Sequence, residues 1–300
     1  DALIASIRNM AAHGIAVIFI THRLQEILTV CDKVLVMRDG EVVAEKLAND
    51  TTVSEITRLM VGRNVAAPTA RVSMNRSDSK PVMTVRNLWV DMPGETVRNV
   101  SLDILEGEIL GIGGLAGQGK LGIPNGIMGL YEAGGQVIYE GKEIPLNAPR
   151  ACLDAGLAFV SEDRRGVGLL LDESLEWNIA FPAMQIQGKF LKSMLGGLVK
   201  WRDERAIRQV TQQYVEQLMI RCTSTKQKAR ELSGGNQQKV CLTKAFALSP
   251  RLLFVSEPTR GIDVGAKALV LEALKKVNHE QGVTIVMISS ELEELRQTCD

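Results

Sequence analysis

Residues 232–239 read Leu-Ser-Gly-Gly-Asn-Gln-Gln-Lys, and this octapeptide is the most informative part of the sequence. Its serine and two glycines mark a helix start, where a hydroxyl and unpaired backbone N–H groups point away from the helix. Such a start attracts anions, because the amides and the helix dipole both favour negative charge. A plain capped helix accounts for the serine but not for the whole octapeptide. The stretch therefore predicts an anion site formed by Ser233, Gly234 and Gly235.

A second glycine-rich stretch, residues 114–121, reads Gly-Leu-Ala-Gly-Gln-Gly-Lys-Leu. It matches the phosphate-binding pattern G-x-x-x-x-G-K-[ST] at every position except the last. In such a loop the glycines let backbone N–H groups curl around phosphate oxygens, and the lysine reaches the outer phosphates. A glycine-rich strand-to-helix turn is also a common structural device, so both interpretations stay open. The candidate phosphate ligands are Gly114, Gly117, Gly119 and Lys120.

A third stretch, residues 251–258, is apolar and ends in Ser-Glu-Pro, with Glu257 twenty-four residues after Ser233 (257 − 233). Loop, octapeptide and acidic strand in this order resemble the ABC ATPases, whose signature LSGGQ takes an Asn-containing form in the sugar-importer branch. The resemblance implies that Glu257 is the catalytic carboxylate and that the octapeptide faces the γ-phosphate of ATP. It also implies that residues 259–263 are the D-loop, which places Asp263 at the nucleotide.

Finer marks resemble the ATP-binding subunits for ribose, galactose and xylose import, in which two nucleotide-binding domains are fused. The second domain of those proteins carries Ser-Glu-Asp-Arg in place of the Q-loop, here residues 161–164, so Glu162 becomes a nucleotide-site residue. It also carries Ser-Ser-Glu where a histidine would stand, here residues 289–291. Near the start of the chain, Thr21-His22-Arg23 resembles the H-loop of the first domain, which implies that His22 contacts the γ-phosphate.

The end of the chain repeats its beginning. Residues 14–32 align without a gap to residues 282–300, an offset of 268 (282 − 14), and both segments end in Cys-Asp. A duplicated domain explains this agreement better than chance similarity between two strand–helix units. We therefore expect residues 1–65 to be the end of a first ABC domain, 66–80 a polar linker and 81–300 a second ABC domain without its last segments. Because residues 1–13 read as the middle of a helix, we also expect a truncated coding sequence.

The patterns predict an α/β P-loop NTPase fold of the ABC ATPase type, with a mainly parallel sheet, an antiparallel segment near its start and an inserted helical subdomain at about 174–236. In residues 1–65 they predict a buried strand at 16–20, a hairpin around Asp39-Gly40 and a helix at 53–61 capped by Thr52. The other predicted elements are a helix over residues 1–13, a helix at 24–30 and strands at 82–88, 101–104 and 108–112.

Two substitutions weaken the magnesium site of the second domain. Leu121 replaces the Ser or Thr that binds Mg²⁺ in the family, and Ser256 replaces the Walker B aspartate. Mg²⁺ requires oxygen ligands in near-octahedral geometry, usually with one or two carboxylates. We therefore expect this site to bind ATP poorly or to hold it without turnover. The resemblance places the competent Mg²⁺–ATP site on the first domain, mostly outside this chain, where the octapeptide of the second domain would complete it.

The place where the family stacks adenine offers one aromatic side chain. Trp89 is the only aromatic residue near the place where the family stacks adenine, and a core position is the favoured interpretation.

Composition narrows the remaining choices. Lys plus Arg and Asp plus Glu are both 35, so the formal net charge is zero, which gives no support to nucleic-acid binding. The five cysteines are scattered and indicate neither a zinc site nor a disulfide framework. The resemblance implies a peripheral protein on the cytoplasmic face of the membrane, partnered by permease subunits and, through them, a solute-binding protein. The alternatives are an importer ATPase for nucleosides or another small solute, and a paired ABC ATPase outside transport.

Overall fold

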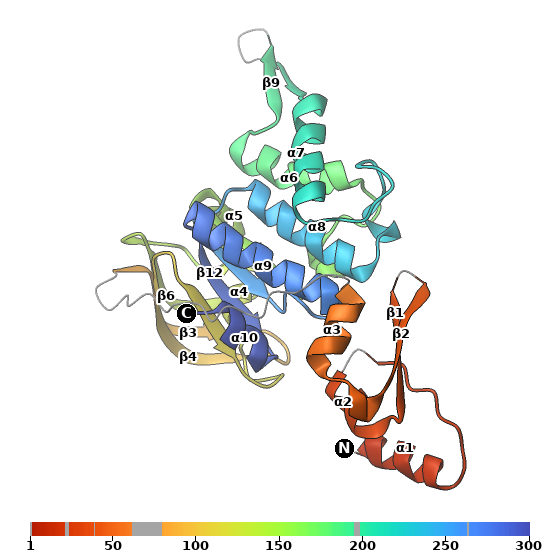
Figure 1. Cartoon of the computed structure of the whole chain (residues 1–300). Coiled ribbons are helices and arrows are strands. Elements are labelled where there is room, and N and C mark those ends of the chain that lie inside the picture. Colours follow the sequence, from red (N-terminus) through yellow and green to blue (C-terminus); the bar gives the residue numbers. More distant parts are fainter. Residues whose placement is uncertain (1, 22–23, 39, 62–79, 195–198, 263) are drawn as a thin grey trace. The chain divides into compact units, whose positions relative to one another are not determined.

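The computed structural model describes residues 2–21, 24–38, 40–61, 80–194, 199–262 and 264–300 (Figure 1). The chain divides into two compact units, the first made of residues 1–68 with 263–268 and the second of residues 69–262 with 269–300. The linker expected at 66–80 lies outside the described residues except for Lys80. Within the described residues, no helix is both long and apolar enough to span a membrane.

The first unit contains a small hairpin and short helices. Leu24, Val34 and Ile56 form its core, and the two strands of the hairpin pair antiparallel, as predicted. The backbone N–H of Glu55 donates to Thr52 Oγ1 at 3.2 Å, which confirms the predicted helix cap. The elements are α1 (Ala2–Ala12), α2 (Leu24–Val30), β1 (Lys33–Arg38), β2 (Glu41–Leu47), the 3-10 helix η1 (Ala48–Asp50) and α3 (Val53–Val61).

The predicted strand at residues 16–20 is wrong. These residues form no strand, and the side chains of Ile18 and Ile20 are 91% and 92% exposed. A buried strand needs neighbours that pair with its backbone and elements that cover its apolar side chains. The described residues of the first unit supply neither for this segment.

The second unit is built on two sheets that share one hydrophobic core. The parallel sheet has the order β5-β12-β11-β8, with β5 (Ile109–Gly113), β8 (Leu157–Val160), β11 (Leu252–Ser256) and β12 (Thr284–Ser289). The antiparallel sheet has the order β4-β3-β6-β7, with β3 (Pro81–Val90), β4 (Val97–Leu105), β6 (Ala133–Tyr139) and β7 (Lys142–Glu143). This arrangement confirms the predicted parallel core and its antiparallel segment. Every residue of β11 and β12 is buried, as expected for central parallel strands.

The register of the parallel sheet creates the edge at which the site lies. Gly113 pairs with Ser289, and Ser256 pairs with Ile288, so β5, β11 and β12 end side by side. Ligands of open α/β sheets bind beyond the carboxyl ends of the strands. Among the described residues, α4 (Gly122–Ile127), α5 (Pro149–Asp154), the π-helical turn η2 (Arg164–Gly168) and α9 (Val264–Gln281) lie between strands of this unit, and α10 (Leu292–Thr298) follows the last strand, β12.

Between β8 and β11 the chain forms the predicted helical part. Its helix α6 (Leu175–Gln187) packs against α7 (Glu204–Gln217) and α8 (Gly234–Ala247), and Ser174 Oγ caps it by accepting from Trp177 N at 3.1 Å. The antiparallel strands β9 (Leu191–Met194) and β10 (Val199–Arg202), visible at the end of this part in Figure 1, were not predicted. A short 3-10 helix, η4 (Ala229–Glu231), precedes α8.

Candidate nucleotide-binding site

The loop at residues 114–121 connects the end of β5 to the start of α4. Gly117 and Gly119 have φ angles of +79° and +83°, a region that side chains with a Cβ rarely adopt. A Cβ on Gly119 would also lie 2.6 Å from the backbone oxygen of Thr96. The loop is therefore fixed closely against the turn that precedes β4.

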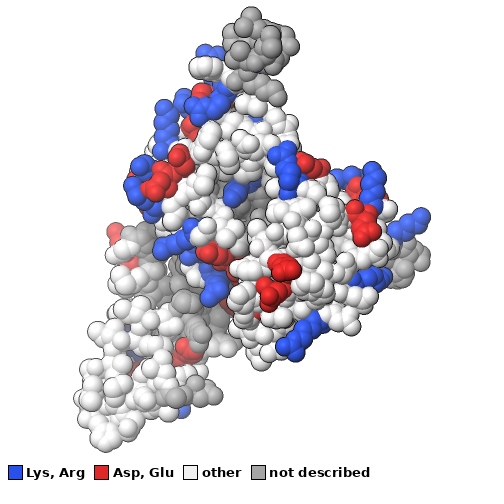
Figure 2. All heavy atoms as spheres, turned by 180° about the vertical axis from the view of Figure 1, so that it is seen from behind, with Lys and Arg blue, Asp and Glu red and all other residues white. Residues whose placement is uncertain are grey.

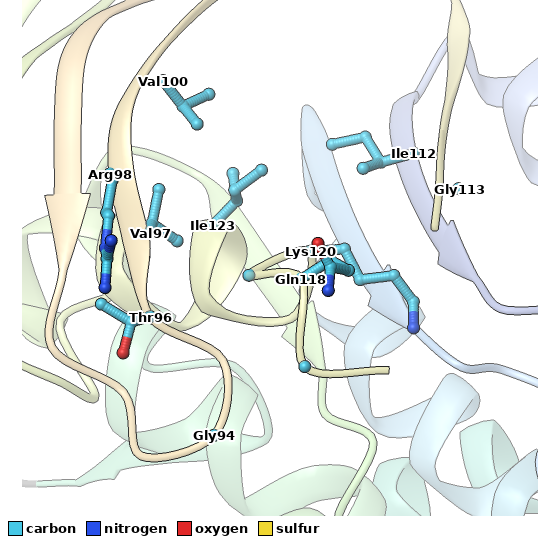
Figure 3. A pocket seen from close by; sticks show the side chains of 12 residues that line it. Gly94, Thr96, Val97, Arg98, Val100, Ile112, Gly113, Gln118, Lys120 and Ile123 are labelled. Carbon is cyan, nitrogen blue, oxygen red and sulfur yellow. The ribbon is translucent and has the colours of Figure 1, made fainter. Parts of the chain in front are cut away.

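A cavity of about 570 Å³ adjoins this loop. In Figure 3, Val97 and Val100 of β4 lie on one side of Lys120 and Ile112 of β5 on the other. Small-molecule sites occupy roughly 300–1,000 Å³ and combine apolar walls with a few polar groups. The cavity thus has the size and the lining of a ligand site next to a phosphate loop.

Trp89, the candidate for adenine stacking, lies away from this cavity. Its side chain is 45% exposed, so the favoured assignment to the core is wrong. It lies over Gly134 in β6, where a Cβ would approach its indole nitrogen to 2.3 Å. Trp89 is not among the described residues that line the cavity.

Lys120 is the cationic centre of the loop. Its side chain is only 4% exposed, and its Nζ lies 3.2 Å from Glu257 Oε1 and donates to Ser290 Oγ at 2.8 Å. Ser290 Oγ in turn donates to the same Glu257 oxygen at 2.5 Å. Three segments far apart in sequence thus converge, because β5, β11 and β12 end together.

A buried carboxylate in α10 fixes the ends of β11 and β12. Glu294 is 3% exposed. One of its oxygens accepts from Thr259 Oγ1, and the other accepts from Ser289 Oγ at 3.0 Å. Thr259 is two residues from Glu257, and Ser289 is next to Ser290. By binding both, Glu294 fixes the turn that carries Glu257 and the strand end that carries Ser290, and both of these side chains contact Lys120.

Glu95 contacts the phosphate loop, although none of the sequence motifs includes it. Its Oε1 accepts from Gly117 N at 2.7 Å and its Oε2 from Leu121 N at 3.4 Å. The side chain is 7% exposed although the turn around it is mostly exposed. No local sequence pattern could have revealed this contact, since it joins a turn to backbone amides more than twenty residues away.

The residues around the loop do not fit a magnesium ion. The Leu121 side chain packs on the hydrophobic core, and Ser256 Oγ is buried without a hydrogen-bond partner among the described residues. Glu162 accepts from Asn125 Nδ2 at 3.4 Å, and Glu257 is paired with Lys120.

The predicted signature forms a second cluster. Ser233 precedes α8 with an extended backbone, and its exposed hydroxyl accepts from Asn236 Nδ2 at 2.9 Å. The Arg164 guanidinium lies beside this helix start. A Cβ placed on Gly234 would be 3.1 Å from Arg164 Nη2. Arg164 Nη1 also donates to the backbone oxygen of Arg260 at 3.1 Å. Gly235 is buried in the first turn of α8.

Two of the predicted site residues, His22 and Asp263, lie outside the described residues. Of the other predicted site residues, Lys120 and Glu257 form an ion pair, and Glu162 accepts a hydrogen bond from Asn125 of α4. Arg164, Glu95 and Asn125 are contacts that the motifs did not single out as site residues.

A glycine loop after a parallel strand, with its lysine held against an acidic residue at the end of a neighbouring strand, defines a phosphate-binding α/β protein of the P-loop class. The chain belongs to the ABC transporter family, whose model matches residues 97–260, more than half of the chain. This confirms the family resemblance given by the octapeptide and the acidic strand.

Curated relatives extend the match to the whole chain. The chain is 39% identical over 303 aligned residues to the ribose import ATP-binding protein RbsA 2 of Rhizobium meliloti, covering 100% of this chain and 56% of that protein. It is 35% identical to the ribose import ATP-binding protein RbsA of Geobacillus kaustophilus, covering 98% of this chain and 57% of that protein. The chain therefore spans just over half the length of these relatives.

Solved structures support the fold. A dimeric bacterial ABC transporter cassette, MJ0796, matches with a TM-score of 0.56 and 22% identity over 72% of this chain and 91% of that chain. A nucleotide-free ATP-binding cassette from an ABC transporter matches with a TM-score of 0.59 and 23% identity over 74% of this chain and 86% of that chain. The predicted α/β cassette with a helical subdomain is thus confirmed.

Proposed function

We propose that this chain is part of the ATP-hydrolysing subunit of an ABC importer for a simple sugar, peripheral to the cytoplasmic face of the membrane. The observation that carries the proposal is the match of the whole chain to proteins named for ribose import. The Asn-containing octapeptide at residues 232–239 supports the same branch. Interspersed basic and acidic side chains on the face in Figure 2 favour this function over a nucleic-acid role.

The two anion sites have different tasks in this proposal. Lys120 is paired with Glu257, and Leu121 and Ser256 stand where the family has its Mg²⁺ ligands, so the loop at 114–121 does not turn over ATP. The start of α8 is exposed at Ser233 and has the Arg164 guanidinium beside it. Ser233, Gly234 and Gly235 therefore bind the γ-phosphate of an ATP held by another ABC domain.

The helical part passes the closure of the paired domains to the membrane. Residues 173–184, which include most of α6, are the proposed contact for the permease subunits. Because α6 packs directly on α8, a shift of the helix that carries Ser233 also moves this surface. A solute-binding protein delivers the sugar to the permease on the far side of the membrane.

The test uses the full-length protein with its permease in proteoliposomes, with ribose-loaded binding protein supplied. We expect Ser233→Arg to abolish stimulated phosphate release, because a bulky cation replaces the hydroxyl at the helix start. Lys120→Ala should leave most of the turnover intact. Equal loss in both variants would contradict the division of tasks, and stimulation by a nucleoside but not by ribose would contradict the sugar assignment.

A further inference from the structure

The amides of the phosphate loop already hold a carboxylate. Both oxygens of Glu95 accept loop hydrogen bonds, from Gly117 N at 2.7 Å and from Leu121 N at 3.4 Å. Glu95 stays within reach because its own backbone N–H donates to Met92 O at 3.0 Å in a tight turn. A Cβ on Gly122 would lie 2.3 Å from the backbone oxygen of Glu95, so this turn and the loop touch at backbone level.

A nucleotide needs the same groups. Backbone N–H groups of a phosphate loop bind phosphate oxygens, and each N–H can serve only one strong acceptor well. A phosphate group placed beside Glu95 would also meet a second negative charge, which is unfavourable at short distance. The carboxylate and the phosphate therefore compete.

We propose that Glu95 is an affinity-determining residue that closes the phosphate loop of this chain to nucleoside triphosphates until its side chain swings out. The proposal rests on the assignment of residues 114–121 as a phosphate loop. Glu257 completes the closure at the side chain of Lys120, which its carboxylate contacts. Carboxylates of the same chain thus contact three anion-binding groups of the loop: the amides of Gly117 and Leu121 and the ammonium of Lys120.

The size of the effect follows from the competition. A hydrogen bond to a charged group contributes about 1.5–3 kcal/mol, so the open form amounts to roughly 1–10% of the molecules. Apparent affinity falls by the same factor as the fraction of the binding-competent form. Removal of the negative charge should therefore raise nucleotide affinity by about tenfold to hundredfold.

The experiment measures binding of a fluorescent ATP analogue to the full chain in the presence of EDTA, which keeps metal binding out of the result. Glu95→Gln should tighten binding by about tenfold to hundredfold. The matched control is Asp91→Asn, which removes the same charge from an exposed side chain in the same turn region. It should leave the affinity unchanged. Adding Lys120→Ala to Glu95→Gln should cancel the gain, because the nucleotide must then bind without the loop lysine.

Several outcomes would overturn the proposal. Unchanged or weaker binding by a folded Glu95→Gln chain would show that the carboxylate only braces the loop. An equal gain in Asp91→Asn would show a general charge effect. If Glu95→Gln does not fold, Glu95→Asp serves instead: the shorter side chain cannot reach both amides, so binding should tighten by a smaller factor, and no change would refute the closure. This assay is independent of the Ser233 result, so failure of one proposal does not hide failure of the other.

Discussion

The two anion-binding segments of the second unit share their chemistry but differ in what surrounds them. The loop at 114–121 offers backbone amides and a lysine, and carboxylates of the same chain occupy both. The start of α8 offers a hydroxyl and amides, and a guanidinium stands beside it. The loop at 114–121 is neutralised by Glu95 and Glu257. The start of α8 has a positive charge beside it, which favours an anion. A motif therefore shows what a segment can bind, and its neighbours decide whether it does.

The largest expected effect concerns the rigidity of the loop. Gly119→Ala should lower the free energy of unfolding by about 3 kcal/mol or more, because the new Cβ adds a backbone clash to an unfavourable φ. The matched control is Gly141→Ala in the turn after β6, where φ is +75° and nothing lies within 4 Å. It should lose only about 1 kcal/mol. Urea unfolding measures both, and equal losses would show that the loop is not held against Thr96.

The other side of the comparison depends on Arg164. In the full-length protein, Arg164→Ala should reduce ATP turnover by about tenfold to hundredfold, because the start of α8 loses a charged neighbour and the 260–261 backbone loses a charge-assisted hydrogen bond. Nucleotide binding at Lys120 should not change. The exposed neighbour gives the control, since Arg165→Ala should retain full turnover. If both variants keep their activity, the guanidinium has no part in the anion site.

The repeated segments show what the sequence could and could not predict. The helices at 24–30 and 292–298 form in both segments, because the backbone hydrogen bonds of a helix lie within the helix itself. The strand forms only at 284–289, where β5 and β11 pair with it. The same apolar pattern at 16–20 has no such neighbours among the described residues and is exposed. A helix completes its backbone hydrogen bonds within its own segment, whereas a parallel strand depends on partners far away in sequence.

The site shows the same limit. Lys120 and Glu257 could be predicted, because the phosphate-loop pattern and the end of an apolar strand are local signals. Glu95 and Arg164 act through contacts with backbone groups, which leave no trace in residue type at either end. Leu121 and Ser256 are visible in the sequence, but the contacts of Glu95 and Glu257 with the loop are not.

The smallest expected effect concerns a buried thiol that contacts α4, the helix after the phosphate loop. Cys152 is fully buried, its Sγ donates to Ile127 O of α4 at 3.1 Å, and burial raises the pKa of its thiol from 9.0 to about 11. A raised folded-state pKa stabilises the fold below the unfolded value, and this contribution is lost as the pH rises from about 9 towards 11. Wild type should therefore lose about 1 kcal/mol between pH 8 and pH 10 from this group. Cys152→Ser keeps a donor for Ile127 but cannot ionise in this range, so its loss over the same interval should be smaller by that amount. The measurement is urea unfolding at both pH values.

Cys241, in the helix that begins at the signature, gives the comparison, because burial raises its thiol pKa to about 12. Cys241→Ser should flatten the pH dependence at least as much, and identical slopes in wild type and Cys152→Ser would show that the thiol behind α4 is not sealed from water.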